Sequence, residues 1–207
     1  MCYHNNMTGN VSAETVMDRR TARLLSRLTA LGATQAAPLS PKSISFDKAE
    51  AVREACRKNI CGQYDASWNC PPAIGTSEEL QEELLSYSSA ILFNIAHPIS
   101  GPFDLAGMAE GEHELDRLLG LIRGELSGGD ISRYKLLGCG GCDICAKCSY
   151  PDAPCLHPGL VFQPIEAAGI DVGELARNCG LRYNNGADTV TFFGMILFDL
   201  VIGEADL

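Results

Sequence analysis

Cysteine is the residue type that most plainly suggests chemistry in this chain of 207 residues, which contains ten of them. The stretch GCGGCDICAKC, residues 138–148, places four cysteines at intervals of three. A Cys-x2-Cys-x2-Cys run lets successive turns present thiolates around one small cluster while backbone N–H groups point at the sulfurs, as in bacterial ferredoxins. The spacing therefore predicts a metal site.

The second-half cysteines exceed the four ligand positions of one cluster. The run also departs from the ferredoxin pattern, because six residues separate Cys148 from Cys155 and Pro154 precedes the last cysteine. Three ligands from a tight run plus one from beyond a proline-containing loop is a familiar arrangement. The ligands that we favour for one [4Fe–4S] cluster are Cys142, Cys145, Cys148 and Cys155. Cys139 is then spare.

A zinc site with four thiolate ligands is the alternative. Zinc ribbons and fingers usually pair two Cys-x2-Cys units across a longer loop, whereas ligands at a strict period of three crowd one side of a tetrahedral ion. The spacing favours iron–sulfur chemistry and leaves zinc open.

The first half of the chain adds Cys56, Cys61 and Cys70, separated by four and eight residues. These thiols are candidates for a second site whose fourth ligand is Cys139, Cys179 or a histidine. The alternative is that they are ordinary loop or core cysteines, since an unpaired cysteine is often buried as a small hydrophobe. Both interpretations stay open, so the sequence predicts one or two [4Fe–4S] clusters.

Two stretches of the chain resemble a prokaryotic family of predicted metal-binding proteins, domain of unknown function 2284. The resemblance covers about residues 49–198. Its first motif matches CRKNICGQYDASWNCPP, with Cys56, Cys61, Tyr64, Trp68, Cys70, Pro71 and Pro72 at the recurring positions. Its second motif matches Cys142, Cys145, Cys148, Tyr150, Pro151, Pro154 and Cys155. The resemblance implies that both cysteine groups bind metal.

One departure from the family pattern follows the second motif. The resemblance implies a basic residue directly after the last motif cysteine, whereas this chain has Leu156 and then His157. This chain therefore lacks, at that position, the positive charge that the pattern implies.

The metal site suggests three classes of function. The first is electron transfer with an unidentified redox protein as partner, because a [4Fe–4S] cluster most often moves single electrons. The second is an enzyme that uses an open iron site as a Lewis acid, for which a group of three cysteines is suited. The third is a protein in which a metal such as zinc only ties loops together.

No independent catalytic constellation supports an enzyme. His97, His113 and His157 lack an evident partner pattern, so we interpret them as surface or loop histidines. Glu110, Glu112 and Glu114 are interpreted as a solvated acidic stretch.

The composition and charge of the chain exclude several classes of function and location. The net charge of −10 argues against nucleic-acid binding and against docking on anionic lipid. The opening MCYHNNMTGN lacks the features of a secretory signal, and the longest apolar stretch, near residue 199, is too short to insert into a membrane. We expect a cytoplasmic protein, where the reducing environment keeps clustered thiols available for metal.

The cysteine stretches must be positioned by regular elements. Helical patterns cover residues 12–32, 48–59, 76–87, 104–126 and 171–180, with Asp47 expected to cap the second. Strand patterns cover residues 88–97, 131–138 and 189–201, and the last of them suits either the core or a subunit interface. We predict a single α/β (or α+β) domain over residues 1–207, with a small mixed sheet and two cysteine-rich inserts near 56–75 and 138–158.

Overall fold

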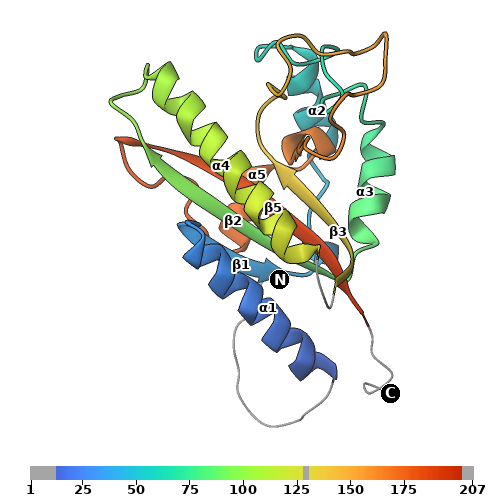
Figure 1. Cartoon of the computed structure of the whole chain (residues 1–207), viewed down its shortest axis with the longest axis vertical. Coiled ribbons are helices and arrows are strands. Elements are labelled where there is room, and N and C mark those ends of the chain that lie inside the picture. Colours follow the sequence, from blue (N-terminus) through green and yellow to red (C-terminus); the bar gives the residue numbers. More distant parts are fainter. Residues whose placement is uncertain (1–12, 128–130, 202–207) are drawn as a thin grey trace.

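Helices and strands are interspersed along the chain. The structure is a computed structural model that describes residues 13–127 and 131–201. Its helices are α1 (Ala13–Ala30), α2 (Ala49–Arg57), α3 (Ser77–Leu85), α4 (Leu105–Leu126) and α5 (Val172–Asn178), with short 3-10 turns η1 (Pro41–Ser43) and η2 (Glu166–Ala168). Its strands are β1 (Gln35–Leu39), β2 (Ser89–Pro98), β3 (Ile131–Gly138), β4 (Gln163–Pro164) and β5 (Thr189–Leu200) (Figure 1).

The five strands form one mixed sheet in the order β1-β2-β5-β3-β4. The pairs β1–β2, β2–β5 and β5–β3 are antiparallel, and β3–β4 is parallel. The apolar last strand, β5, therefore lies in the centre of the sheet and forms core. Pro38 lies on the edge strand β1, where its missing N–H costs no ladder hydrogen bond.

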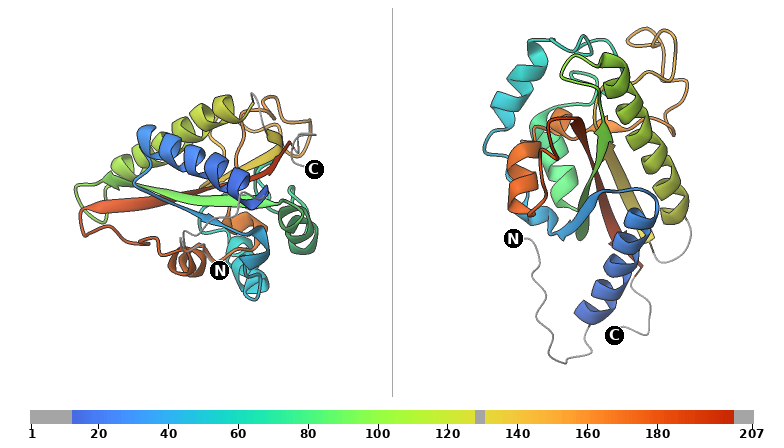
Figure 2. Two further views of the ribbon diagram at one scale, coloured as in Figure 1. Left: turned by 90° about the horizontal axis from the view of Figure 1, so that it is seen from below. Right: turned by 90° about the vertical axis from the view of Figure 1, so that its left-hand side faces the viewer.

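Helices cover both faces of the sheet. Side chains alternate along β2, so that Ile91 and Phe93 join a cluster with α1 and α4, while Ala90 and Leu92 join a cluster with α3 and α5. Figure 2 shows α1 and α4 over one face, and α2, α3 and α5 over the other. The result is a three-layer α/β arrangement, which confirms the predicted fold class.

Helix starts follow from local side-chain hydrogen bonds. The Thr76 hydroxyl accepts a hydrogen bond from the Glu79 N–H and the Glu79 carboxylate accepts one from the Thr76 N–H, a capping box at the start of α3. Asp104 caps α4 by a single hydrogen bond, which its carboxylate accepts from the Gly107 N–H. The prediction that Asp47 caps α2 was wrong, because α2 begins one residue later, with Lys48 at its N-cap and no side-chain cap there.

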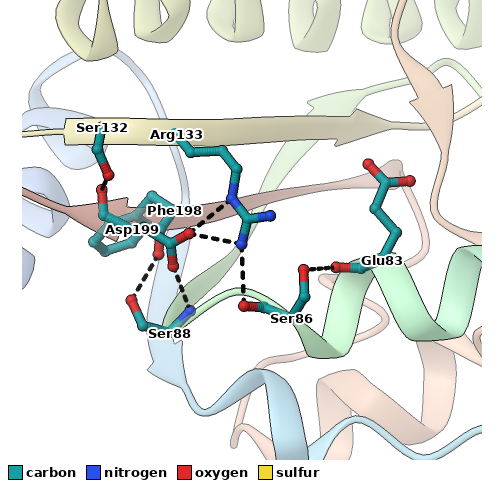
Figure 3. A network of polar contacts seen from close by, with 7 residues as sticks. All are labelled: Glu83, Ser86, Ser88, Ser132, Arg133, Phe198 and Asp199. Carbon is teal, nitrogen blue, oxygen red and sulfur yellow. Dashed lines mark hydrogen bonds and ion pairs between the residues drawn. The ribbon is translucent and has the colours of Figure 1, made fainter.

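Asp199 is an acidic residue within the apolar sequence of β5. It takes part in a network of polar contacts at one end of the sheet (Figure 3). Its carboxylate accepts hydrogen bonds from the Ser88 N–H at 2.7 Å and from the Arg133 guanidinium at 2.7 Å. Arg133 also donates to the carbonyl of Ser86, just beyond α3, at 3.0 Å. The network connects the ends of α3 and β5 to the starts of β2 and β3.

None of the helices within the described residues could span a membrane, because each is too short or too polar.

Candidate metal site

Both cysteine loops lie at the same end of the sheet. The first cysteine loop, residues 56–75, leads from the end of α2 toward α3, and the second cysteine loop, residues 138–158, follows β3. In Figure 1 they lie side by side at the top of the molecule, in cyan and orange. The fold thus brings together two groups of cysteines that are far apart in the sequence.

Three contacts join the two loops. The Trp68 indole N–H donates to the carbonyl of Ala153 at 3.0 Å, and the Trp68 and Tyr150 rings meet edge to face with centroids 5.0 Å apart. The Tyr150 hydroxyl donates to the Asp65 carboxylate at 2.7 Å. Both loops contain a cis prolyl bond, Pro71–Pro72 in the first and Tyr150–Pro151 in the second. The aromatic residues of the two motifs therefore hold the loops against each other.

The two glycines of the CGGC stretch allow this close approach. Gly140 has a φ of 69°, and a Cβ there would collide with the carboxylate of Glu112 on α4. A Cβ at Gly141 would collide with the side chain of Gln63 from the first cysteine loop. No side chain larger than hydrogen fits at either position unless its neighbour moves.

One pocket gathers the four cysteines that the sequence predicts as ligands. Its lining includes Cys142, Cys145, Cys148 and Cys155. Trp68 and Asn69 of the first cysteine loop and Ile144 and Val161 complete much of the wall. The volume is about 20 Å³, room for about one water molecule, so the loop must open to admit anything larger.

The pKa of Cys142 is affected by the thiols that lie around it. Burial raises the pKa of the Cys142 thiol, and the neighbouring thiols of Cys148, Cys155 and Cys145 raise it further. The backbone N–H of Ile144 donates to the Cys142 sulfur and acts to lower the pKa. The thiols lie within electrostatic reach of one another, and a backbone donor already faces one sulfur.

The donor set fits either a [4Fe–4S] cluster or zinc, because both take four thiolates. Within residues 13–127 and 131–201, no three His, Cys, Asp or Glu side chains converge closely enough to hold a metal ion as they stand. The four thiols line a small pocket and do not converge on one position. Residues 139–162 contain no helix or strand, so no regular element resists a rearrangement of the loop around a metal.

The first-half thiols lie beside this pocket. Burial raises the pKa of Cys70 to about 11, and the thiols of Cys61, Cys56 and Cys142 contribute to the rise. Cys70 is buried in its loop, Cys61 is exposed, and Cys56 is in the last turn of α2. The first-half thiols thus lie within electrostatic reach of one another, and Cys70 lies within such reach of Cys142.

Cys139 has a different environment. It packs against the hydrophobic cluster that α4 forms with the sheet. Burial raises the pKa of its thiol, and the carboxylates of Glu112, Glu166 and Asp116 raise it further. Cys139 is also absent from the pocket that the other four clustered thiols of this half line, and its assignment as spare or as a ligand of a second site stays a prediction.

The sequence predicted a solvated acidic stretch on α4, but Glu112 and Glu114 face other parts of the protein. His97 Nδ1 lies 2.8 Å from the Glu114 carboxylate, and His113 Nε2 lies 2.5 Å from the carboxylate of Asp143 in the second cysteine loop. Burial raises the pKa of Glu112 where that side chain faces the loop. These partners are 17 and 30 residues apart, and no short sequence pattern joins them.

Comparison with protein families gives a match over most of the chain. A family model described as predicted metal-binding protein (DUF2284) matches residues 37–198, which include both cysteine loops and most of the sheet. The comparison with curated proteins found no match, and neither did the comparison with solved structures.

Proposed function

We propose that this chain, which belongs to the family of predicted metal-binding proteins (DUF2284), holds a [4Fe–4S] cluster and transfers electrons. The proposed ligands are Cys142, Cys145, Cys148 and Cys155. The observation that carries the proposal is that these four thiols, selected by spacing alone, line one pocket. When bound, a [4Fe–4S] cluster supplies one-electron redox chemistry.

Residues around the pocket are suited to set the properties of such a cluster. Trp68, Ile144 and Val161 shield the pocket from water, and the Ile144 N–H donates to the Cys142 sulfur. Hydrogen bonds to sulfur raise a cluster's potential, whereas a net charge of −10 lowers it. Ten cysteines and a cluster also suit the reducing environment of the cytoplasm.

A redox protein is the proposed partner, and it is expected to dock on the cysteine loops. Large apolar side chains are exposed on both loops and just beyond the second: Ile60, Ile144, Leu156 and Leu160. Ile60 is 92% exposed and Leu156 is 68% exposed. Exposed apolar side chains beside a site are typical of contact surfaces, and Ile144 and Leu156 also line the cysteine pocket. A partner that covers them would come close to the cluster.

A structural zinc site is the second candidate, and the small volume of the pocket favours it. About 20 Å³ admits a single ion with less movement of the loop than a cluster needs. In that case the metal would only fix the two cysteine loops, and no electron transfer would follow.

Metal analysis of protein purified without oxygen separates the two candidates. About four irons with about four acid-labile sulfides per chain, and a visible absorption band that dithionite bleaches, would support the cluster. About eight irons would add a second cluster that uses Cys56, Cys61 and Cys70. One zinc per chain without sulfide would contradict electron transfer and support the structural site.

Single substitutions test the ligand set. Cys145→Ser should remove the iron and the visible band, because serine is a poor replacement for a thiolate ligand. Cys139→Ala is the matched control from the same run, and it should keep the full iron content. Equal loss of iron in both variants would contradict the assigned ligands.

A further inference from the structure

A second, larger pocket lies directly beside the cysteine pocket. Its volume is about 350 Å³, which lies within the range of pockets that bind small molecules. The two pockets share four lining residues, Trp68, Asn69, Cys155 and Val161. Anything bound in the larger pocket would therefore lie next to one of the four clustered thiols.

The charged side chains that line this larger pocket are both cationic, in a chain whose net charge is −10. They are Arg123 from α4 and Lys135 from β3. Lys135 already forms an ion pair with Glu83, with its Nζ 2.7 Å from the carboxylate. Arg123 pairs with no carboxylate among the residues that the structure describes, and its guanidinium lies over the Phe162 ring at 4.5 Å from the centroid. The ring fixes the cation and leaves its donors available.

A second lining residue has a side-chain donor without an acceptor. The side-chain nitrogen of Gln163 is buried and makes no hydrogen bond within the described part of the chain. A buried donor without a partner costs free energy that a bound acceptor would recover. Arg123 and Gln163 both line the pocket, and a small rotation of the Gln163 amide would bring its N–H to a ligand that carries anionic oxygen atoms beside Arg123.

The rest of the wall is largely apolar. Trp68, Ile74, Leu136, Pro158 and Val161 contribute carbon surface to it. An inorganic anion would leave this surface without a partner, whereas an organic acid would cover it. The lining therefore selects a ligand with a carboxylate at one end and an apolar body.

We propose that the pocket between α4, β3 and the two cysteine loops binds a small organic carboxylate through Arg123 and Gln163, with its apolar part against Trp68 beside Cys155. Binding itself does not require metal. The placement of the ligand next to a redox centre rests on the proposed function.

The test is calorimetric titration of the whole chain with benzoate, in which a carboxylate is joined to an apolar ring. Benzyl alcohol has a similar ring without the charge, and inorganic phosphate has the charge without the ring. We expect benzoate to bind and both comparison compounds to bind at least about tenfold more weakly, because a charge-assisted Arg pair and apolar burial both contribute. Binding of benzyl alcohol as tight as that of benzoate, or displacement of benzoate by equimolar phosphate, would overturn the proposal.

Two variants locate the site. Arg123→Gln should weaken benzoate binding about tenfold or more, and Gln163→Glu should weaken it too by setting a carboxylate against the ligand. Arg117→Gln is the matched control, an exposed arginine on the same helix that does not line the pocket. Unchanged benzoate affinity in Arg123→Gln, or an equal loss in Arg117→Gln, would contradict the assignment, and thermal melts identify a variant that fails to fold.

Trp68, the single tryptophan of the chain, gives a further readout because it lines both pockets. Its fluorescence should change on benzoate addition in metal-free protein as well as in metal-loaded protein. Iron and sulfide content are measured on the same samples, so failure of the cluster proposal and failure of carboxylate binding give different results.

Discussion

Along β2 and β5, neighbouring side chains alternate between two hydrophobic clusters, whereas every residue from 139 to 158 in the second cysteine loop is at least partly exposed. The sheet buries Phe93 and Phe198 completely, while the loops are joined mainly by hydrogen bonds and one ring pair. Apolar burial can stabilise the sheet without help. The loops need another source of order, and metal ligation can supply folding free energy directly.

The largest effect is expected where the sheet is most tightly packed. Phe198→Ala removes a fully buried ring from the cluster between the sheet and α4, and should lower the free energy of unfolding by about 3–5 kcal/mol. Urea denaturation followed by circular dichroism measures the loss. The metal content per folded molecule should stay at the wild-type value. If the metal content falls together with the stability, the packing of the sheet and metal binding by the loops are not independent.

A smaller effect is expected at the junction of the two regions. The buried guanidinium of Arg53 on α2 donates to the carbonyls of Ala167 at 2.6 Å and of Gly75 at 2.7 Å. Arg53→Met leaves both acceptors without this donor and should cost about 2–3 kcal/mol. Hydrogen exchange should show the added opening in residues 56–75 before β2 and β5. If exchange instead rises evenly over the whole chain, Arg53 stabilises the entire fold and not the junction.

Within the loops, the expected effect is smaller still. Trp68→Phe keeps a ring against Tyr150 but removes the indole N–H that donates to the Ala153 carbonyl, at a cost of about 1 kcal/mol. Limited proteolysis should cut the second cysteine loop faster in the variant, with no change in the cutting of β2 or β5. Equal cutting rates in wild type and variant would mean that this hydrogen bond does not hold the loops together.

The smallest effect is a pH dependence at the opposite end of the sheet. Burial acts to raise the pKa of Asp199, but hydrogen bonds from Ser88 and Arg133 outweigh it and leave the pKa below its ordinary value. A lowered folded-state pKa gives stability that is fully present above the unfolded pKa, about 3.9, and is lost as the pH falls through the folded value.

Asp199→Asn should therefore remove part of the acid destabilisation below about pH 4, in urea unfolding measured between pH 2 and pH 6. The exposed Asp188, changed to Asn, is the control and should leave the profile as it is in wild type. A wild-type acid profile in Asp199→Asn would show that the network of Figure 3 contributes no pH-dependent stability.

Local patterns predicted the long elements well because their signals lie within a few residues. The strand at residues 131–138 and the helix that Asp104 caps were predicted almost to the residue. The two-residue strand β4 has no such signal, since only its parallel pairing with β3 defines it. Sheet order also rests on pairings between distant segments, which a single sequence does not display.

The four second-half thiols were predicted from spacing, but the pocket walls were not. Trp68 and Ala153 are 85 residues apart, so their contact follows only from the placement of both loops at one end of the sheet. Arg123 lies on the polar side of an amphipathic helix and has the pattern of an ordinary solvated residue. Its role beside Gln163 emerges only once α4, β3 and β4 are packed together.

The central position of β5 also determines when the protein can fold during synthesis. β5 pairs with both β2 and β3, yet it follows every other strand in the chain. The ribosome must therefore release residues up to about 200 before β2 and β3 gain their shared neighbour, and at 5–20 residues per second this takes seconds after the cysteine loops emerge. For that interval the nascent chain has both cysteine loops but not the complete sheet that places them side by side, so we expect a metal centre that uses both loops to assemble after the last strand is made.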